Sequence, residues 1–388
     1  MTSSFFGVNI DSSCKTQNGT TCPPIPPTLG SNVAAPRLED FTVPRVRVLE
    51  HSYTPYSDGL RDAVLEAMRG ELRTADLAQL HFALGEAYAA AAKPFAKNAG
   101  LVSSHGQTVF HIPRLENARG WHTRATLQLG EASLIAEETG LPVIADFRPA
   151  DLVAGGQAAP LVPFADRVIF AEPGVRRAMH NLGGISNLTF LPGLDLENVI
   201  AFDTGPANCL IDEAAGLFQK RYDKNGEIAA GGQIERGLLE VWLRDPYLEL
   251  GPPKSTGREV WNLQNLAGVF ELAPQDIVSS VTAFSAQTVI DAYKRFVPAN
   301  LDQVIVAGGG AFNPLLMRAM REQLAGIEVI TLEESRFAEH GLNSSTREAA
   351  AFAVLGYYAF QGWANTIPHT TGARHAVIAG KLTRPAPA

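Results

Sequence analysis

Apolar residues recur along this chain of 388 residues with two different periods, and each period predicts one type of element. Between residues 57 and 98 they return at every third or fourth position, which predicts two amphipathic helices. Short apolar runs predict strands at 5–10, 101–104, 126–130 and 141–147, with a further helix over 131–139. Strands that alternate with helices indicate an α/β layer architecture.

The middle of the chain has a different pattern. Residues 177–203 predict a hairpin that turns at Gly183 and Gly184, followed by a third strand, so antiparallel strands join the sheet. Helices are expected over 208–221, 237–244 and 276–296, and residues 303–320 predict a buried strand, a glycine turn and a helix. The Pro-rich segment 18–36 is expected to be a loop or tether, and the tail from Leu382 to be frayed.

Composition and charge exclude several classes of protein. The 32 basic and 40 acidic residues give a net charge of −8 without a long basic run, which disfavours nucleic acid as a partner. The three cysteines have no C-x-x-C spacing, so neither a disulfide framework nor a structural metal site is expected. No signal segment and no run of about 18 apolar residues is present, so we expect a cytoplasmic protein without a membrane partner.

Glycine turns that follow apolar strands are the clearest chemical signal. They lie at Gly183 and Gly184, at Gly205, and at 308–310. Glycine lets backbone N–H groups approach a ligand without a Cβ in the way, which is how phosphates are often bound. One such turn is more often only a turn, but three in one chain favour a ligand site. The P-loop, dinucleotide, G-x-S-x-G and H-E-x-x-H motifs are absent from the sequence.

Two acidic residues are candidates for chemistry, each with an alternative. Asp203 ends an expected strand just before a Gly-Pro turn, where a carboxylate can project from the sheet edge as a general base. The alternative is an aspartate that caps the helix near Asn208. Glu348 precedes an apolar helix, and it fits a first-turn glutamate favoured by the helix dipole as well as a functional residue.

Two polar loops stay open between function and structure. His105, Gln107 and Thr108 follow a strand directly, which is a common position for ligand contacts, although a histidine that stabilises a turn fits equally well. The loop with Lys254, Ser255, Thr256 and Arg258 is cationic, so it can meet an anion or simply be a solvated turn.

Several strings, taken in order, resemble the anhydro-N-acetylmuramic acid kinase family and its relatives that act on levoglucosan. They include SSHGQTVFH (103–111), NLGGISNLT (181–189), FDTGPAN (202–208), PPKSTGREVWNL (252–263) and AGGGAFNPLLM (307–317). The resemblance implies an actin-like and hexokinase-like (ribonuclease H-like) fold with mixed sheets flanked by helices. It also implies a first lobe of residues 1–176 plus about 350–388, a second lobe of residues 177–349, and an active site between them.

The resemblance further implies an ATP- and Mg²⁺-dependent kinase that opens a 1,6-anhydrosugar with water and phosphorylates O6. Asp203 would activate the water and Glu348 would help hold the sugar, so both are assigned to the reaction. The residues implied for the nucleotide are Asp11, Ser12, Ser13, Lys15, Gly183, Gly184, Gly308, Gly309, Gly310 and Asn313. Those expected at the sugar are His105, Gln107, Thr108, Arg148, Gly205 and Asn208. The metal ligands are not assigned, and the oligomeric state is left open, with a homodimer as one possibility.

The sequence also departs from the family pattern. Where the family has G-T-S-x-D-G, this chain reads DSSCKT, which places Asp11 at the first glycine and Lys15 at the aspartate. The Pro-rich segment occupies the place of the family's second strand. A basic residue expected after DFR is replaced by Ala150, which favours a neutral anhydrosugar such as levoglucosan. The alternative function is a catalytically impaired member that binds sugar or nucleotide without efficient turnover.

Overall fold

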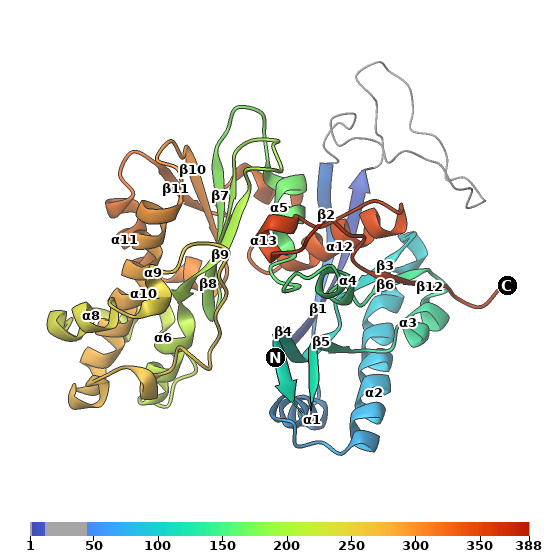
Figure 1. Ribbon diagram of the computed structural model, residues 1–388, viewed down its shortest axis with the longest axis horizontal. Helices are drawn as coiled ribbons and strands as arrows, with labels where there is room; N and C mark the ends of the chain where they lie inside the picture. The colour runs from blue at the N-terminus through green and yellow to red at the C-terminus, as the bar shows by residue number, and fades with distance from the viewer. Residues whose placement is uncertain (1, 12–44, 119, 388) are drawn as a thin grey trace. The chain divides into compact units, whose positions relative to one another are not determined.

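A computed structural model describes residues 2–11, 45–118 and 120–387 (Figure 1). The chain forms two compact units, which are described separately below. The first contains Met1–Ile169, His340–Leu342 and Thr346–Ala388, and the second contains Phe170–Glu339 and Asn343–Ser345. The segment 18–36, which we predicted as a loop or tether, lies outside the described residues.

The first unit contains three small sheets with helices packed beside them. Its strands are β1 (Thr2–Asp11), β2 (Arg45–Pro55), β3 (Val102–Ser104), β4 (Gln107–Ala118), β5 (Trp121–Leu129), β6 (Val143–Ala145) and β12 (Lys381–Thr383). Its helices are α1 (Asp58–Arg69), α2 (Thr74–Ala92), the 3-10 helix η2 (Lys93–Asn98), α3 (Ala132–Thr139), α4 (Pro149–Val153), α5 (Val162–Phe170), α12 (Arg347–Phe360) and α13 (Pro368–Thr371).

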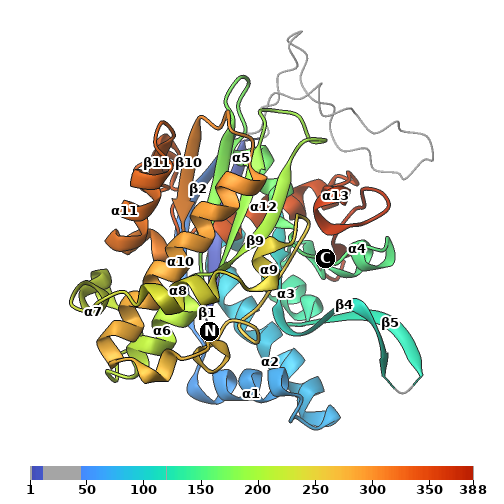
Figure 2. The same ribbon diagram turned by 60° about the vertical axis from the view of Figure 1, so that its left-hand side comes forward.

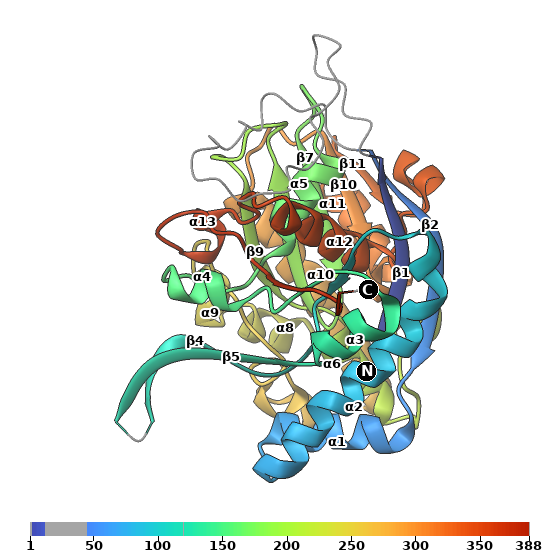
Figure 3. The same cartoon turned by 90° about the vertical axis from the view of Figure 1, so that its right-hand side faces the viewer.

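Strand pairing organises this unit. β6 pairs parallel with β3 and antiparallel with β12, and β1 pairs antiparallel with β2. The apolar faces of α1, α2 and α3 meet in a core that includes Val64, Leu84, Tyr88 and Ile135. Figure 3 shows β4 and β5 as a two-stranded antiparallel ribbon that extends away from α2 and α3.

The second unit is a five-stranded mixed sheet in the order β11-β10-β7-β8-β9. Its strands are β7 (Arg177–Leu182), β8 (Ile185–Leu191), β9 (Ile200–Pro206), β10 (Gln303–Ala307) and β11 (Glu328–Thr331). Its helices are α6 (Asn208–Gly216), α7 (Glu227–Ala230), α8 (Arg236–Trp242), α9 (Pro246–Glu249), α10 (Pro274–Phe296) and α11 (Pro314–Gln323). The 3-10 helices are η3 (Lys224–Gly226), η4 (Leu263–Asn265), η5 (Val269–Glu271), η6 (Gly309–Phe312) and η7 (Arg336–His340).

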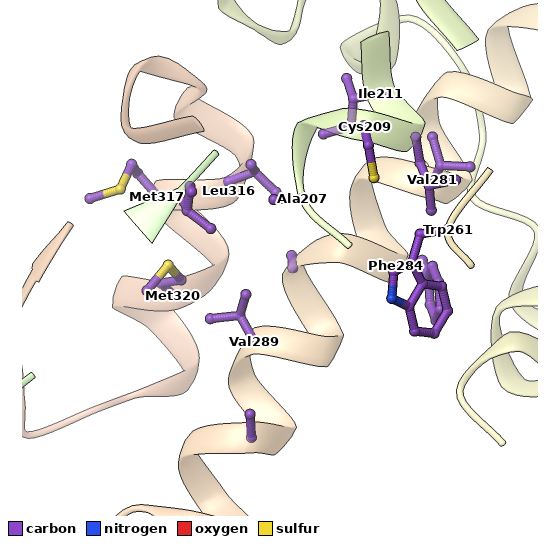
Figure 4. Close-up of a cluster of buried hydrophobic side chains, with 14 of the residues drawn as sticks. Ala207, Cys209, Ile211, Trp261, Val281, Phe284, Val289, Leu316, Met317 and Met320 are labelled. Atoms are coloured by element: carbon purple, nitrogen blue, oxygen red, sulfur yellow. The ribbon is translucent and has the colours of Figure 1, made fainter. Parts of the chain in front are cut away.

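Helix α10 is the centre of the second core. Pro274 lies in its first turn, where its missing N–H costs nothing, and most of the helix is buried against α6, α11 and β9. Figure 2 shows α10 running along the sheet. In Figure 4, Val281, Phe284 and Val289 of α10 lie among side chains from α6 and α11. This packing fixes the helices that follow the strand ends β9 and β10.

The predicted α/β class, with mixed sheets flanked by helices, is confirmed, and so are the hairpin turn at Gly183 and Gly184 and the helices over 57–98. Four details were wrong. The helix from Asn208 ends at Gly216 rather than 221, and Leu382 and Thr383 pair in β12 instead of fraying. A second strand, β2, is present after the Pro-rich segment, which we had placed in that strand's position. The strand β4 was not predicted. Among the described helices, none is long and apolar enough to cross a membrane.

A buried ion pair fastens α12 to α5 within the first unit. Arg347 donates from Nε to Oδ1 of Asp166 at 3.2 Å and from Nη2 to Oδ2 at 2.6 Å. Both side chains are almost entirely buried, with exposed fractions of 9% and 0%. The pair matters here because Glu348, a candidate site residue, directly follows Arg347 on α12.

Replacing Arg347 with Met is expected to lower the free energy of unfolding by about 3 kcal/mol, because a buried carboxylate then loses its cation. Arg61→Met removes an arginine from an exposed pair with Asp58 and should cost less than about 1 kcal/mol. Urea denaturation followed by circular dichroism compares the two variants. Equal, small effects would show that the Arg347 pair does not hold α12 in place.

Candidate functional site

Three strands of the second unit end at the same edge of the sheet. β10 runs parallel to β7, and β9 is also parallel to β7 because both pair antiparallel with β8. Their carboxyl ends therefore lie together, and glycines stand at or just beyond each of them. In open α/β sheets this edge is where ligands bind.

Backbone and side-chain hydrogen bonds tie the first two turns together. The N–H groups of Ala207 and Cys209 donate to the Gly184 carbonyl at 3.1 and 3.0 Å, and the N–H of Asn208 donates to the Gly183 carbonyl at 3.0 Å. The side-chain amide nitrogen of Asn208 (Nδ2) also donates to the carbonyls of Leu182 and Gly183, both at 2.9 Å. Asn208 therefore shapes the turn, and its contact with a sugar stays a prediction.

The third turn packs directly on the first. Gly308 has φ of +88°, and a Cβ at this position would lie 2.7 Å from Asn181 Oδ1 and 2.8 Å from the Leu182 carbonyl oxygen. Only glycine permits this approach. The Gly308 N–H donates to Ser344 Oγ at 3.0 Å, whereas Gly309 and Gly310 begin the short helix η6.

Two predicted ligand residues have structural roles in this unit. Asn313 is buried and caps α11, where its Oδ1 accepts from the Leu315 N–H at 3.0 Å. Gly205 lies inside β9, and its position leaves room for Thr288 of α10. Their roles at nucleotide and sugar stay predictions.

Asp203 lies within β9, three residues before its end, and not at its last residue as expected. It does not cap α6, whose N-cap is Ala207, so the capping alternative is wrong. Its Oδ2 accepts from the Thr256 N–H at 2.9 Å, and its carbonyl oxygen accepts from the Tyr247 hydroxyl at 2.7 Å. Burial raises the pKa of Asp203 to about 6, while the Thr256 N–H and the Lys254 charge oppose that shift. A carboxyl poised near neutral pH suits a general base.

The two cations of the 254–258 loop have different environments. Lys254 is buried, and its ammonium donates to the carbonyls of Tyr247 and Leu248 at 3.1 and 3.4 Å. Arg258 is exposed instead, and its guanidinium lies against the Gly184 turn, since a Cβ on Gly184 would be 2.6 Å from Nη2. Of the two, Arg258 is placed to meet an anion at that turn.

A second polar group lies in the first unit. Arg148 donates from Nε to His105 Nε2 at 3.1 Å and from Nη1 to the Ala158 carbonyl at 2.6 Å. His105 Nδ1 lies 2.9 Å from the Gly106 carbonyl oxygen, so the ring donates there and accepts from Arg148. Burial and the Arg148 charge lower the pKa of His105 to about 3.

The other residues expected at the sugar differ in their contacts. Gln107 and Thr108 begin β4, where Gln107 Oε1 accepts from Tyr56 and Thr108 Oγ1 accepts from Gln128 Nε2 at 3.1 Å. Glu348 is exposed in the first turn of α12, as the dipole interpretation predicted. Burial lowers the pKa of Arg148, and the charge of Glu348 counteracts that effect. The structure thus brings His105, Arg148 and Glu348 into one electrostatic group.

Most of the nucleotide-binding residues predicted near the N-terminus lie outside the described residues. Asp11 ends β1, where its backbone pairs with Arg45, while Ser12, Ser13 and Lys15 lie outside the described residues. Sequence reasoning missed Tyr247, for which no motif exists, and left Arg258 undecided although it stands in a matched string. Within the ranges that the structure describes, no three His, Cys, Asp or Glu side chains gather as a metal site would require.

Glycine turns at one sheet edge, with a partly buried carboxyl of raised pKa beside them, are typical of α/β enzymes that act on phosphate compounds. Comparison with known proteins gives a narrower class. The family described as anhydro-N-acetylmuramic acid kinase matches residues 30–385, so the match begins after DSSCKT. The chain belongs to the anhydro-N-acetylmuramic acid kinase family and hence to a family of kinases.

Individual relatives cover most of the chain. Proteins named anhydro-N-acetylmuramic acid kinase from Caldanaerobacter subterraneus subsp. tengcongensis and from a Cyanothece species are each 39% identical. They cover 87% and 86% of this chain and 89% and 90% of their own. One from Bacillus cereus is 36% identical, over 92% of this chain and 96% of its own. A ROK hexokinase from Thermus thermophilus aligns with 82% of this chain and 95% of its own at 16% identity, but the TM-score of 0.33 adds nothing to the assignment.

His105 is expected to stay neutral, with its proton on Nδ1, from pH 5 to pH 8. The cause is its burial beside a cation, which holds its pKa at about 3. The ¹⁵N chemical shifts of the ring report both tautomer and charge. Arg148→Met should raise the pKa of His105, and titration of the parent ring near its ordinary value of about 6.5 would contradict the assignment.

Proposed function

We propose that this protein is an ATP-dependent kinase that opens a 1,6-anhydrosugar with water and phosphorylates O6 to give the sugar 6-phosphate. The observation that carries the proposal is the partly buried Asp203 carboxyl, held by the Thr256 N–H beside the glycine turns of the second unit. Family membership supports the substrate class, since the relatives are named for that sugar. An active site between the two lobes stays a prediction.

The second unit fits the phosphates of a nucleotide. A Cβ at Gly308 would meet Asn181 and Leu182, and a Cβ at Gly184 would meet the Arg258 guanidinium, so glycine is what lets these turns and the guanidinium gather at one sheet edge. Arg258 adds a guanidinium over Gly184, which suits a phosphate oxygen. ATP supplies the phosphoryl group, and Mg²⁺ needs only one or two carboxylates besides the phosphates. We assign no described residue to the metal.

Asp203 takes a proton from the attacking water. The water oxygen bonds to the anomeric carbon, the bond from that carbon to the bridging oxygen breaks, and the bridging oxygen becomes O6. O6 then bonds to the γ-phosphorus of ATP, the bond from that phosphorus to the oxygen of ADP breaks, ADP leaves, and the proton held by Asp203 passes to solvent. Phosphoryl transfer depends mainly on position and charge, whereas the attack by water needs a base, so a single carboxylate suffices for the proton.

The first unit offers groups for the sugar. The Arg148 guanidinium and the exposed Glu348 carboxylate provide donors and acceptors for hydroxyl groups, with Gln107 and Thr108 nearby in sequence. Neutral His105, whose two ring nitrogens are taken by Gly106 and Arg148, orients the guanidinium. Ala150 provides no cation for a lactyl carboxylate, which supports a neutral anhydrosugar such as levoglucosan. Both sugars therefore belong in every assay.

Asp203→Asn is expected to lower kcat about 10²- to 10⁴-fold with the favoured sugar, because the water loses its base. In the parent, kcat/KM should fall below pH 6, since the carboxyl has a pKa of about 6 and acts only when ionised. A coupled assay of ADP formation measures both effects. Asp62→Asn, at an exposed aspartate, is the matched control. Parent-level activity in Asp203→Asn would refute the base assignment.

The impaired alternative has its own signature. DSSCKT places Lys15 where the family has an acidic residue, and an ammonium there repels a metal ion. If the parent turns over neither sugar but Lys15→Asp gains ATP-dependent turnover, the protein is the impaired member. Turnover in the parent excludes that alternative.

Arg258→Gln is expected to raise the KM for ATP about tenfold, which corresponds to the loss of one charge-assisted hydrogen bond. Arg258→Lys should recover part of the loss because the charge remains while the planar fork is lost. Arg236→Gln removes an exposed arginine from α8 of the same unit as a control. An unchanged KM in Arg258→Gln would place the phosphates away from Gly184.

A further inference from the structure

Lys254 lies in an aromatic cage although it belongs to a loop rich in polar residues. Its Nζ is 4.7 Å from the centre of the Tyr247 ring, 4.9 Å from that of Phe296 and 5.8 Å from that of Phe202. Only 8% of the residue is exposed. Ring faces attract a cation, and the carbonyls of Tyr247 and Leu248 accept two of its three N–H donors. The ammonium is therefore committed to the protein rather than to a ligand.

The groups that hold Lys254 also hold Asp203. The Asp203 N–H donates to the Lys254 carbonyl at 3.0 Å, and two residues along the loop the Thr256 N–H donates to the Asp203 carboxylate at 2.9 Å. Tyr247 contributes its ring to the cage and its hydroxyl to the Asp203 carbonyl. Phe202 precedes Asp203 in β9. The cage therefore joins α9, the end of α10 and the loop to the strand that carries the carboxyl.

The remaining charges near the cage balance one another. Arg295 of α10 and Glu249 of α9 both act on the Lys254 charge, and they form an ion pair at 2.7 Å. Burial lowers the pKa of Lys254 to about 8, so the ammonium is largely charged at neutral pH. Asp203 is faced by Lys254, by the Tyr247 hydroxyl and by the Thr256 N–H.

We propose that Lys254 is a positioning residue, which holds the 254–256 segment against β9 so that the Thr256 N–H stays on the Asp203 carboxylate and keeps it ionised. This inference rests on the proposed function for its catalytic consequence. Lys254 touches neither sugar nor nucleotide in this account. Its effect reaches the reaction only through the carboxyl that it positions.

Loss of the Lys254 ammonium should shift the acid limb of the kcat/KM profile more than it lowers the value of kcat/KM at high pH. Without the charge and with a looser N–H contact, the pKa of Asp203 rises above about 6. Lys254→Met is expected to move the acid limb of kcat/KM up by about one pH unit, which is a loss of about fivefold at pH 6. At pH 8.5 the loss should be less than about twofold. Lys254→Arg, which keeps a cation able to stack on the rings, should hold the limb nearer to that of the parent.

Lys294→Met is the matched control, since it removes an exposed lysine from α10 with the same change of charge. Its acid limb should coincide with that of the parent. Phe296→Leu weakens the cage without changing any charge, so a smaller upward shift is expected. This variant also keeps the proposal testable if Lys254→Met does not fold.

A direct titration separates this inference from the proposed function. The ¹³C carboxyl resonance of Asp203 in the full chain can be assigned by its loss in Asp203→Asn, and its pKa should rise by about one unit in Lys254→Met. If the parent has no kinase activity while this rise occurs, the proposed function fails and the positioning role stands. If neither the resonance nor the acid limb moves relative to Lys294→Met, the positioning role is overturned.

Discussion

A carboxyl partly buried in a sheet is driven to take up a proton unless it is given partners, and the second unit is arranged around this constraint at Asp203. One partner is the Thr256 N–H, which exists at that position only because the 254–256 segment lies against β9. A second contact holds the backbone of β9, since the Tyr247 hydroxyl of α9 donates to the Asp203 carbonyl oxygen. The result is a carboxyl with a pKa near 6, which is ionised at neutral pH yet basic enough to accept a proton.

The glycine turns satisfy a second constraint, the close approach of three chain segments. Gly308 packs on Asn181 and Leu182, and the backbone after β9 donates to the carbonyls of Gly183 and Gly184. These contacts use glycine for packing as well as for access. The same absence of a Cβ lets the Arg258 guanidinium, a group that suits an anion, lie against the Gly184 turn. Structural and ligand-binding interpretations of such glycines are therefore not exclusive.

Much of this arrangement could be predicted from local patterns. Helical periodicity located α1, α2 and α10, and the glycine pair located the β7–β8 turn, because each depends on neighbouring residues. β2 and β4 were missed, since the prolines before β2 and the polar SSHGQT string, which runs into the start of β4, favoured loops there. The cage around Lys254 could not be predicted, because its rings come from residues 202, 247 and 296 and meet only in the folded chain. The position of Asp203 before a Gly-Pro turn made it a candidate base, the family resemblance implied that water is what it activates, and the structure shows its partners.

The central claim is that one reaction adds both water and a phosphoryl group to a 1,6-anhydrosugar. Mass spectrometry of the product formed from ATP, Mg²⁺ and each sugar tests it most directly. The account predicts a product that carries one phosphate and one added water, with the phosphate on O6 by ³¹P–¹H correlation. A phosphorylated sugar whose anhydro bridge is intact, or no ATP-dependent product from either sugar, would contradict it.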